Sequence, residues 1–106
     1  MKNKNAYNSF KKSLEEIKEK FDYLSFKADQ KEVLEGEDVL YRGFPPNSNR
    51  FSIILSYNSN RPFLHVRVYE KNDANFVEDI LKKNFPNVYK VDDLPQWNRW
   101  NINAFL

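Results

Sequence analysis

The sequence contains no cysteine and only two glycines, Gly36 and Gly43, among its 106 residues. The lack of cysteine excludes a disulfide framework, a thiolate zinc site and a thiol nucleophile. Two isolated glycines do not form the glycine-rich loop with which P-loop and Rossmann proteins hold nucleotide phosphates. No apolar run reaches the ~18 residues of a membrane-spanning helix. No apolar stretch follows the basic N-terminus, as a signal peptide would require.

Histidine is almost as scarce, because His65 is the single one in the chain. A metal site would therefore depend on carboxylates, which gather at residues 32–38 and at residues 92–93. Neither stretch has the spacing of a calcium-binding loop. We therefore expect no metal ion and no cofactor, and we interpret these acids as a solvated loop or as a contact surface for a basic partner.

Aromatic residues, in contrast, make up 16% of the chain, while 17 basic and 15 acidic side chains leave a net charge of only +2. This combination is typical of a folded chain with an aromatic-rich core and excludes a disordered one. The length predicts one domain over residues 1–106. A cysteine-free composition fits best with a cytoplasmic location.

Two segments have the spacing of amphipathic helices. In the first segment the apolar residues recur in steps of three and four, and the last of them is Phe21. These residues are Tyr7, Phe10, Leu14, Ile17 and Phe21. The second is expected over residues 74–85, with its N-cap supplied by residues 71–73 and its apolar side formed by Phe76, Val77, Ile80, Leu81 and Phe85.

The remaining segments alternate as strands do. A half-buried strand is expected at residues 23–28, and a hairpin at residues 31–34 and 39–42. The clearest pair is a hairpin of residues 50–57 and 63–69 around a loop rich in turn formers, and Phe51 of this hairpin is expected in the core. A short strand is expected at residues 88–91. Residues 97–106 are expected either to end as a strand, with Trp100, Ile102 and Ala104 on one face, or to begin with one helical turn at residues 97–100.

The pattern predicts an α+β fold in the order α-β-β-β-β-α-β. A mainly antiparallel sheet of about four to five strands would carry two helices packed on one face, because hairpins join most of the strands.

The strand at residues 63–69 suggests one binding surface. Its period of two places Leu64, Val66 and Val68 toward the helices and interleaves aromatic and basic side chains on the opposite face. Such a face can hold single-stranded nucleic acid, because rings stack on bases and cations meet phosphates. The candidate nucleic-acid-binding residues are Tyr41, Arg42, Phe63, His65, Arg67 and Tyr69. The alternative is an amphipathic outer face on which arginine stems cover the rings.

His65 also raises the alternative of a small, metal-independent ribonuclease. Imidazole is the acid–base group suited to neutral pH, and Arg67 would hold the scissile phosphate beside Tyr69 and Tyr41. The sequence places no carboxylate beside His65.

The C-terminal segment of residues 97–106 suggests a second surface. Trp97, Arg99, Trp100 and Phe105 include the residue types most enriched at interface hot spots. If this segment were exposed, these four would bind a protein partner or a second copy of the chain; if it docks on the sheet, Trp100 and Ile102 belong to the core.

With no credible catalytic set in a compact chain, the leading hypothesis is a non-enzymatic interaction module. It would inhibit a partner protein by occluding its surface, as small proteins of phages, mobile elements or immunity systems do. A single-stranded nucleic-acid-binding module is the first alternative, the ribonuclease is the second, and homodimerisation stays open.

Overall fold

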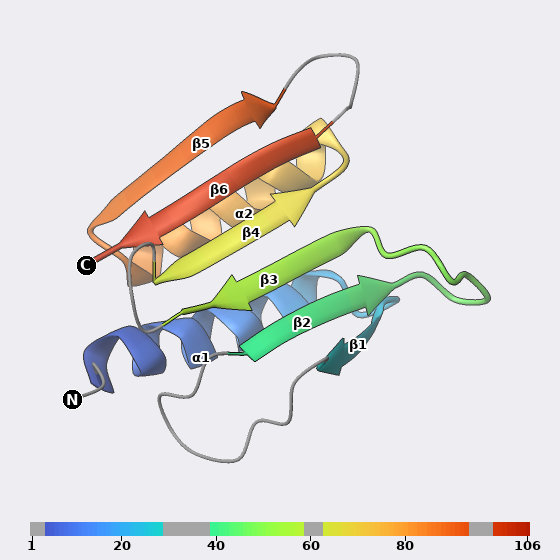
Figure 1. Ribbon diagram of the computed structural model, residues 1–106, viewed down its shortest axis with the longest axis horizontal. Helices are drawn as coiled ribbons and strands as arrows, with labels where there is room; N and C mark the ends of the chain where they lie inside the picture. Colours follow the sequence, from blue (N-terminus) through green and yellow to red (C-terminus); the bar gives the residue numbers. More distant parts are fainter. Residues whose placement is uncertain (1–3, 29–38, 59–62, 94–98) are drawn as a thin grey trace.

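The structure, a computed structural model, describes residues 4–28, 39–58, 63–93 and 99–106 (Figure 1). Its elements in chain order are α1 (Lys4–Lys20), β1 (Ser25–Ala28), β2 (Val39–Phe44), β3 (Ile53–Tyr57), β4 (Leu64–Val68), α2 (Lys71–Asn84), β5 (Asn87–Asp93) and β6 (Arg99–Phe105). The strands form one sheet in the order β1-β2-β3-β4-β6-β5, and every pairing between neighbours is antiparallel.

The predicted α+β class and element order are confirmed, with six strands where four or five were expected. The additional strand lies in the C-terminal part, where both predicted segments are strands that pair with each other. The hairpin expected from residues 31–34 falls outside the described residues. In the structure β2 instead pairs with β1 on one side and with β3 on the other.

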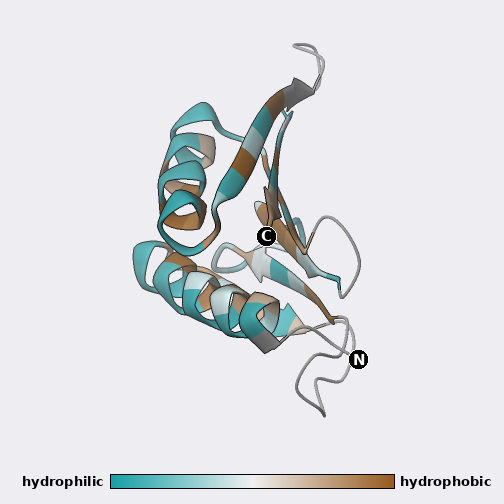
Figure 2. Cartoon of the chain, turned by 90° about the vertical axis from the view of Figure 1, so that its left-hand side faces the viewer, coloured by the Kyte–Doolittle hydropathy of each residue, from teal (hydrophilic) through white to brown (hydrophobic). Residues whose placement is uncertain are grey.

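Both helices lie on the same side of the sheet (Figure 2). In α1 the buried residues follow the predicted stripe, with Phe10, Leu14 and Ile17 inside and Tyr7 packed at the margin of the core. In α2 Val77, Ile80 and Leu81 are buried. Each fully buried side chain of this size stabilises the fold by about 1.5–3 kcal/mol relative to exposure. One face of the sheet therefore packs against the helices to form the core, and the helices do not cover the opposite face.

The core-facing side of the sheet follows the period-two alternation of its strands. Its buried residues are Val39, Tyr41, Ile53, Leu55, Tyr57, Leu64, Val66, Val68, Ile102 and Ala104. Phe10 of α1 stacks on Tyr57 of β3, with ring centroids 4.7 Å apart, so aromatic packing holds α1 against the sheet. Gly43 lies at the close approach of β1, β2 and β3, where a side chain would collide with Ile53.

One amide group joins the two helices. The Nδ2 atom of Asn84, at the end of α2, donates to Ser13 Oγ at 3.0 Å and to Glu16 Oε2 at 2.9 Å on α1. Ser13 is fully buried, so this contact satisfies a polar group inside the helix layer.

Three details of the sequence-based prediction are wrong. Helix α2 begins at Lys71, not at Ala74, and its N-cap is Glu70. Phe76, expected in the core, is exposed, and Phe51, also expected there, is half-buried at the opposite face of the sheet. Phe76 lies within α2 but beside the buried stripe of Val77, Ile80 and Leu81, and Phe51 lies before the start of β3, outside its alternation. Among the described residues, no helix is long and apolar enough to cross a membrane.

Candidate nucleic-acid interface

The side of the sheet opposite the helices, here called the outer face, is arranged in rows of paired residues across the strands. The central row runs from Lys27 of β1 through Arg42, Ile54 and Arg67 to Asn101 of β6. The next row contains Ser56 of β3, His65 of β4, Asn103 of β6 and Tyr89 of β5. Because paired residues of antiparallel strands point to the same side, these two rows together bring residues of all six strands to one surface.

Charge is distributed unequally between the two sides of the molecule. Lys27, Arg42, Arg67 and Arg99 occupy outer-face positions. Among the outer-face positions of the described strands, Asp93 is the single acidic residue, and it is paired with Arg99 at the end of β5. The helices and the short segments beside them instead mix both signs, with acidic residues at Glu15, Glu16, Glu19, Asp22, Glu70, Asp73, Glu78 and Asp79. The outer face is therefore cationic although the whole chain is nearly neutral.

His65 and Arg67 are held by two asparagines of the neighbouring strand. The Nδ1 atom of His65 lies 2.7 Å from the Oδ1 atom of Asn103, and the Nε atom of Arg67 donates to Asn101 Oδ1 at 3.1 Å. Because an amide oxygen can only accept, His65 donates from Nδ1 and its Nε2 atom remains for another contact. In Arg67 the terminal guanidinium nitrogens remain for an anion.

Aromatic rings form a cluster beside the cations, near the loop between β2 and β3. The rings of Phe44 and Phe51 are 6.4 Å apart between centroids, and those of Phe51 and Tyr69 are 5.9 Å apart. Arg42 lies over Phe51 at 5.5 Å and Lys27 over Phe44 at 5.4 Å. Each cation is thus placed where a ring face attracts it.

A surface hollow of about 470 Å³ adjoins this cluster and is lined by Asn49, Arg50, Phe51 and Tyr69. The hollow places two aromatic rings and a guanidinium group around one open space. A flat base can stack on these rings beside the Arg50 side chain.

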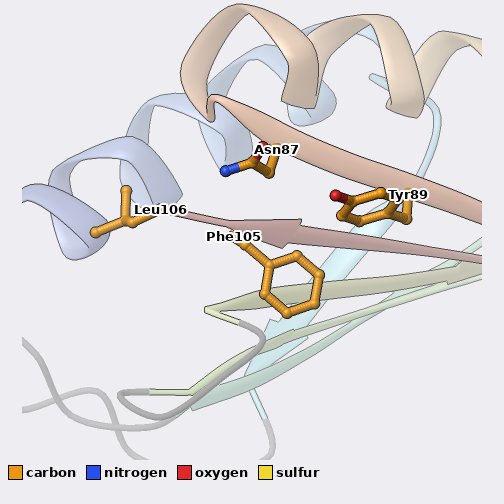
Figure 3. A pocket seen from close by; sticks show the side chains of 4 residues that line it. All are labelled: Asn87, Tyr89, Phe105 and Leu106. Atoms are coloured by element: carbon orange, nitrogen blue, oxygen red, sulfur yellow. The ribbon is translucent and has the colours of Figure 1, made fainter.

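A second aromatic pair lies at the other end of the sheet. Tyr89 of β5 and Phe105 of β6 meet edge to face, with centroids 5.7 Å apart, and line a smaller hollow together with Asn87 and Leu106 (Figure 3). Tyr89 is 60% exposed, so its ring is accessible to a flat ligand. Since Tyr89 pairs with Asn103 in the strand register, this aromatic pair lies at the β5 end of the row that contains His65.

The structure brings together four of the six residues predicted for nucleic-acid binding: Arg42, His65, Arg67 and Tyr69. The expected placement of Tyr41 and Phe63 is wrong, because both are buried. Tyr41 alternates with Arg42 and therefore faces the helices, where Phe10 packs against it. Phe63 precedes β4 and is buried like its neighbour Leu64, so it does not follow the alternation of that strand.

The sequence-based prediction missed the asparagines and three of the rings. Asn101, Asn103, Phe44, Phe51 and Tyr89 were not included in the candidate set. A signal for the asparagines was present: if Trp100, Ile102 and Ala104 share one face, Asn101 and Asn103 share the other. The pairing of these asparagines with His65 and Arg67 depends on strand order, which the pattern does not contain.

The residues predicted for partner binding are divided between the two faces. Arg99 and Phe105 lie at outer-face positions of β6, whereas Trp100 packs against the core on the helix side. Trp97 lies outside the described residues. The described part of this segment, residues 99–106, is thus docked as an inner strand of the sheet, and its aromatic residues do not gather in one patch.

Two further exposed rings, Tyr23 and Phe76, lie on the helix side, and each is about half exposed. Lys20 lies over the Phe76 ring. Burial, then the charges of Asp73 and Glu70, raises the pKa of Tyr23. Burial and Glu70 likewise raise the pKa of Asp73. Acidic groups are thus crowded at the start of α2, which disfavours an anionic ligand at that end of the helix.

In the part of the chain that the structure describes, no group of three metal-ligating side chains is close enough to hold an ion. The acidic stretch at residues 32–38 lies outside that part. No family model, no curated protein and no solved structure matches this chain.

Proposed function

We propose that this protein binds single-stranded nucleic acid across the outer face of its sheet. The observation that carries the proposal is the segregation of four cations and two aromatic clusters onto the side of the sheet that the helices leave uncovered. Phosphate contacts supply sequence-independent affinity, and exposed rings supply stacking for any base.

The arrangement favours a single strand over a duplex. In a duplex the bases stack on each other and present only their edges, so rings on an open sheet cannot reach their faces. The outer face offers rings at both ends, at Tyr69 and at Tyr89, with Arg67 and His65 between them. A strand that crosses the sheet would place bases on the two aromatic ends and phosphates over the central row.

Salt dependence gives the proposal a quantitative test. A single strand loses affinity with a slope of about −0.7 per neutralised phosphate in a plot of log K against log salt concentration. One phosphate at each of Lys27, Arg42, Arg67 and Arg99 predicts a slope of about −2.8. Arg67→Ala should reduce it to about −2.1 and weaken binding at low salt about tenfold.

The measurement is fluorescence anisotropy of labelled single-stranded RNA and DNA, with a duplex for comparison. Lys12→Ala is the matched control, because it removes one exposed positive charge from α1 on the other side of the molecule. Circular dichroism should show that both variants remain folded. The absence of binding by the wild type at low salt, or equal losses for Arg67→Ala and Lys12→Ala, would falsify the proposal.

The hypothesis of an inhibitor that occludes a partner protein, of phage or mobile-element type, stays a prediction. Part of its support was the aromatic C-terminal segment, and residues 99–105 of that segment form an inner strand of the sheet. The predicted cytoplasmic location agrees equally well with a nucleic-acid-binding role.

A further inference from the structure

His65 and Arg67 lie together on the outer face with their side chains oriented by a neighbouring strand, an arrangement that binding alone does not require. We propose that this face also cleaves the single-stranded RNA it binds, with His65 as the general base and Arg67 as the phosphate-holding cation. This inference rests on the proposed function, since the RNA must first occupy the outer face.

The orientation of His65 is suited to taking a proton. Asn103 accepts from Nδ1 at 2.7 Å, which fixes both the ring plane and the tautomer in which Nε2 carries a lone pair. His65 is half-buried, so the ring is supported by its neighbours and yet reachable from the open face. A base with a fixed lone pair is what general-base catalysis needs in its ground state.

Arg67 lies in the right place to act on the same nucleotide. It is two residues from His65 on the same face of β4, which separates the two Cα atoms by about 6.6 Å, twice the rise of a strand. Its Nε atom is bonded to Asn101, so the terminal nitrogens present a fixed pair of donors. Such donors stabilise the extra negative charge that a phosphate gains in the transition state.

The reaction is a transesterification within the RNA strand. The 2′-hydroxyl oxygen attacks the adjacent phosphorus while its proton passes to Nε2 of His65. The new bond from the 2′ oxygen to phosphorus forms a 2′,3′-cyclic phosphate, and the bond from phosphorus to the 5′ oxygen breaks. The departing 5′ oxygen takes a proton from water on the open face, and the imidazolium returns its proton to the solvent. DNA lacks the 2′-hydroxyl and cannot react.

The aromatic residues on either side explain how the reacting nucleotide would be held. Tyr69 follows Arg67 by two residues, and Tyr89 pairs with Asn103, the residue that orients His65. Bases stacked on these rings would leave the linkage between them over His65 and Arg67. Cleavage is therefore expected within single-stranded regions and not in duplexes.

The test uses the full chain and an end-labelled single-stranded RNA of mixed sequence, with DNA of the same sequence, in the presence of EDTA. We expect RNA fragments that end in a 2′,3′-cyclic phosphate and DNA that is bound but intact. His65→Gln should slow cleavage by about 10²–10⁴-fold, the usual contribution of a general base. Lys12→Ala should cleave at the wild-type rate.

Asn103 is a positioning residue, and its variants separate orientation from folding. Asn103→Ala should slow cleavage about tenfold or more while RNA affinity changes little, and Asn103→Asp should restore most of the rate because its carboxylate also accepts from Nδ1. A wild type that binds RNA and leaves it intact, or a His65→Gln variant that cleaves as fast as the wild type, would overturn the cleavage proposal alone. A wild type that binds no RNA overturns the proposed function itself.

Discussion

Gly43 offers the most direct test of how closely β1, β2 and β3 are packed. A Cβ atom added at this position would lie 2.5 Å from Ile53 Cγ2, 3.0 Å from Phe26 Cε1 and 3.1 Å from Leu24 Cδ1. The first distance is shorter than side chains tolerate, and Ile53 is itself buried, so it cannot move aside freely.

The expected change in the free energy of unfolding for Gly43→Ala is the sum of two opposed effects. Replacing glycine by alanine stiffens the unfolded chain and by itself would stabilise the protein by about 0.4–1 kcal/mol. Forcing a methyl group into a packed core costs about 1–3 kcal/mol. Because three neighbours surround the added atom, the steric term should win, and Gly43→Ala should lower the free energy of unfolding by about 1–2 kcal/mol.

A second substitution identifies the cause of the loss. Ile53→Leu keeps the side-chain volume but removes the Cγ2 methyl group, which makes the shortest contact. In a double-mutant cycle, Gly43→Ala should therefore cost less in the Ile53→Leu background than in the wild type. Urea denaturation followed by tryptophan fluorescence measures all four free energies. If Gly43→Ala is neutral or stabilising, or if its cost is the same in both backgrounds, the steric reasoning is wrong.

Two further predictions concern the helix layer. Asn84→Ala should lower the free energy of unfolding by about 1–2 kcal/mol, because it leaves buried Ser13 without the amide that joins the helices. Urea denaturation measures this free energy, and an unchanged midpoint would refute the role of the contact. Burial, and then the charge of Glu70, raises the pKa of Asp73 above its ordinary value of 3.8, so the folded state binds the Asp73 proton more tightly than the unfolded state does. The wild type should thus lose stability relative to Asp73→Asn as pH rises from below about 3.8 through the raised pKa of Asp73. Unfolding measured in urea across this range checks the sign, and a stability difference independent of pH would contradict the prediction.

Much of the fold could be predicted because it depends on local patterns. The helix stripe of Phe10, Leu14 and Ile17, and the alternation of Leu64, Val66 and Val68, are properties of neighbouring residues, and the structure confirms both. Two of the aromatic residues that were placed wrongly lie outside the regular part of a strand. Phe63 precedes its strand and Phe51 adjoins a loop, so neither takes its place from a period of two.

The candidate site was only partly predictable for the same reason. His65 and Arg67 lie on β4 and Tyr69 directly follows it, and their spacing of two residues predicted a common face. Tyr41 was assigned to that face by residue type, although its own strand turns it toward the helices. The orientation of His65 could not be foreseen, because Asn103 is 38 residues away in the sequence.

The element order, the amphipathic faces and the outward side of His65 and Arg67 on β4 follow from the periodicity of consecutive side chains, so they could be predicted without a structure. The tertiary structure decided the strand order, which places β6 between β4 and β5. Only that order brings Asn101 and Asn103 beside Arg67 and His65, joins Tyr89 to the same face, and docks Trp100 against the core. The reason is physical: pairing between strands distant in sequence is set by which apolar faces can be buried together, and no local pattern records that choice.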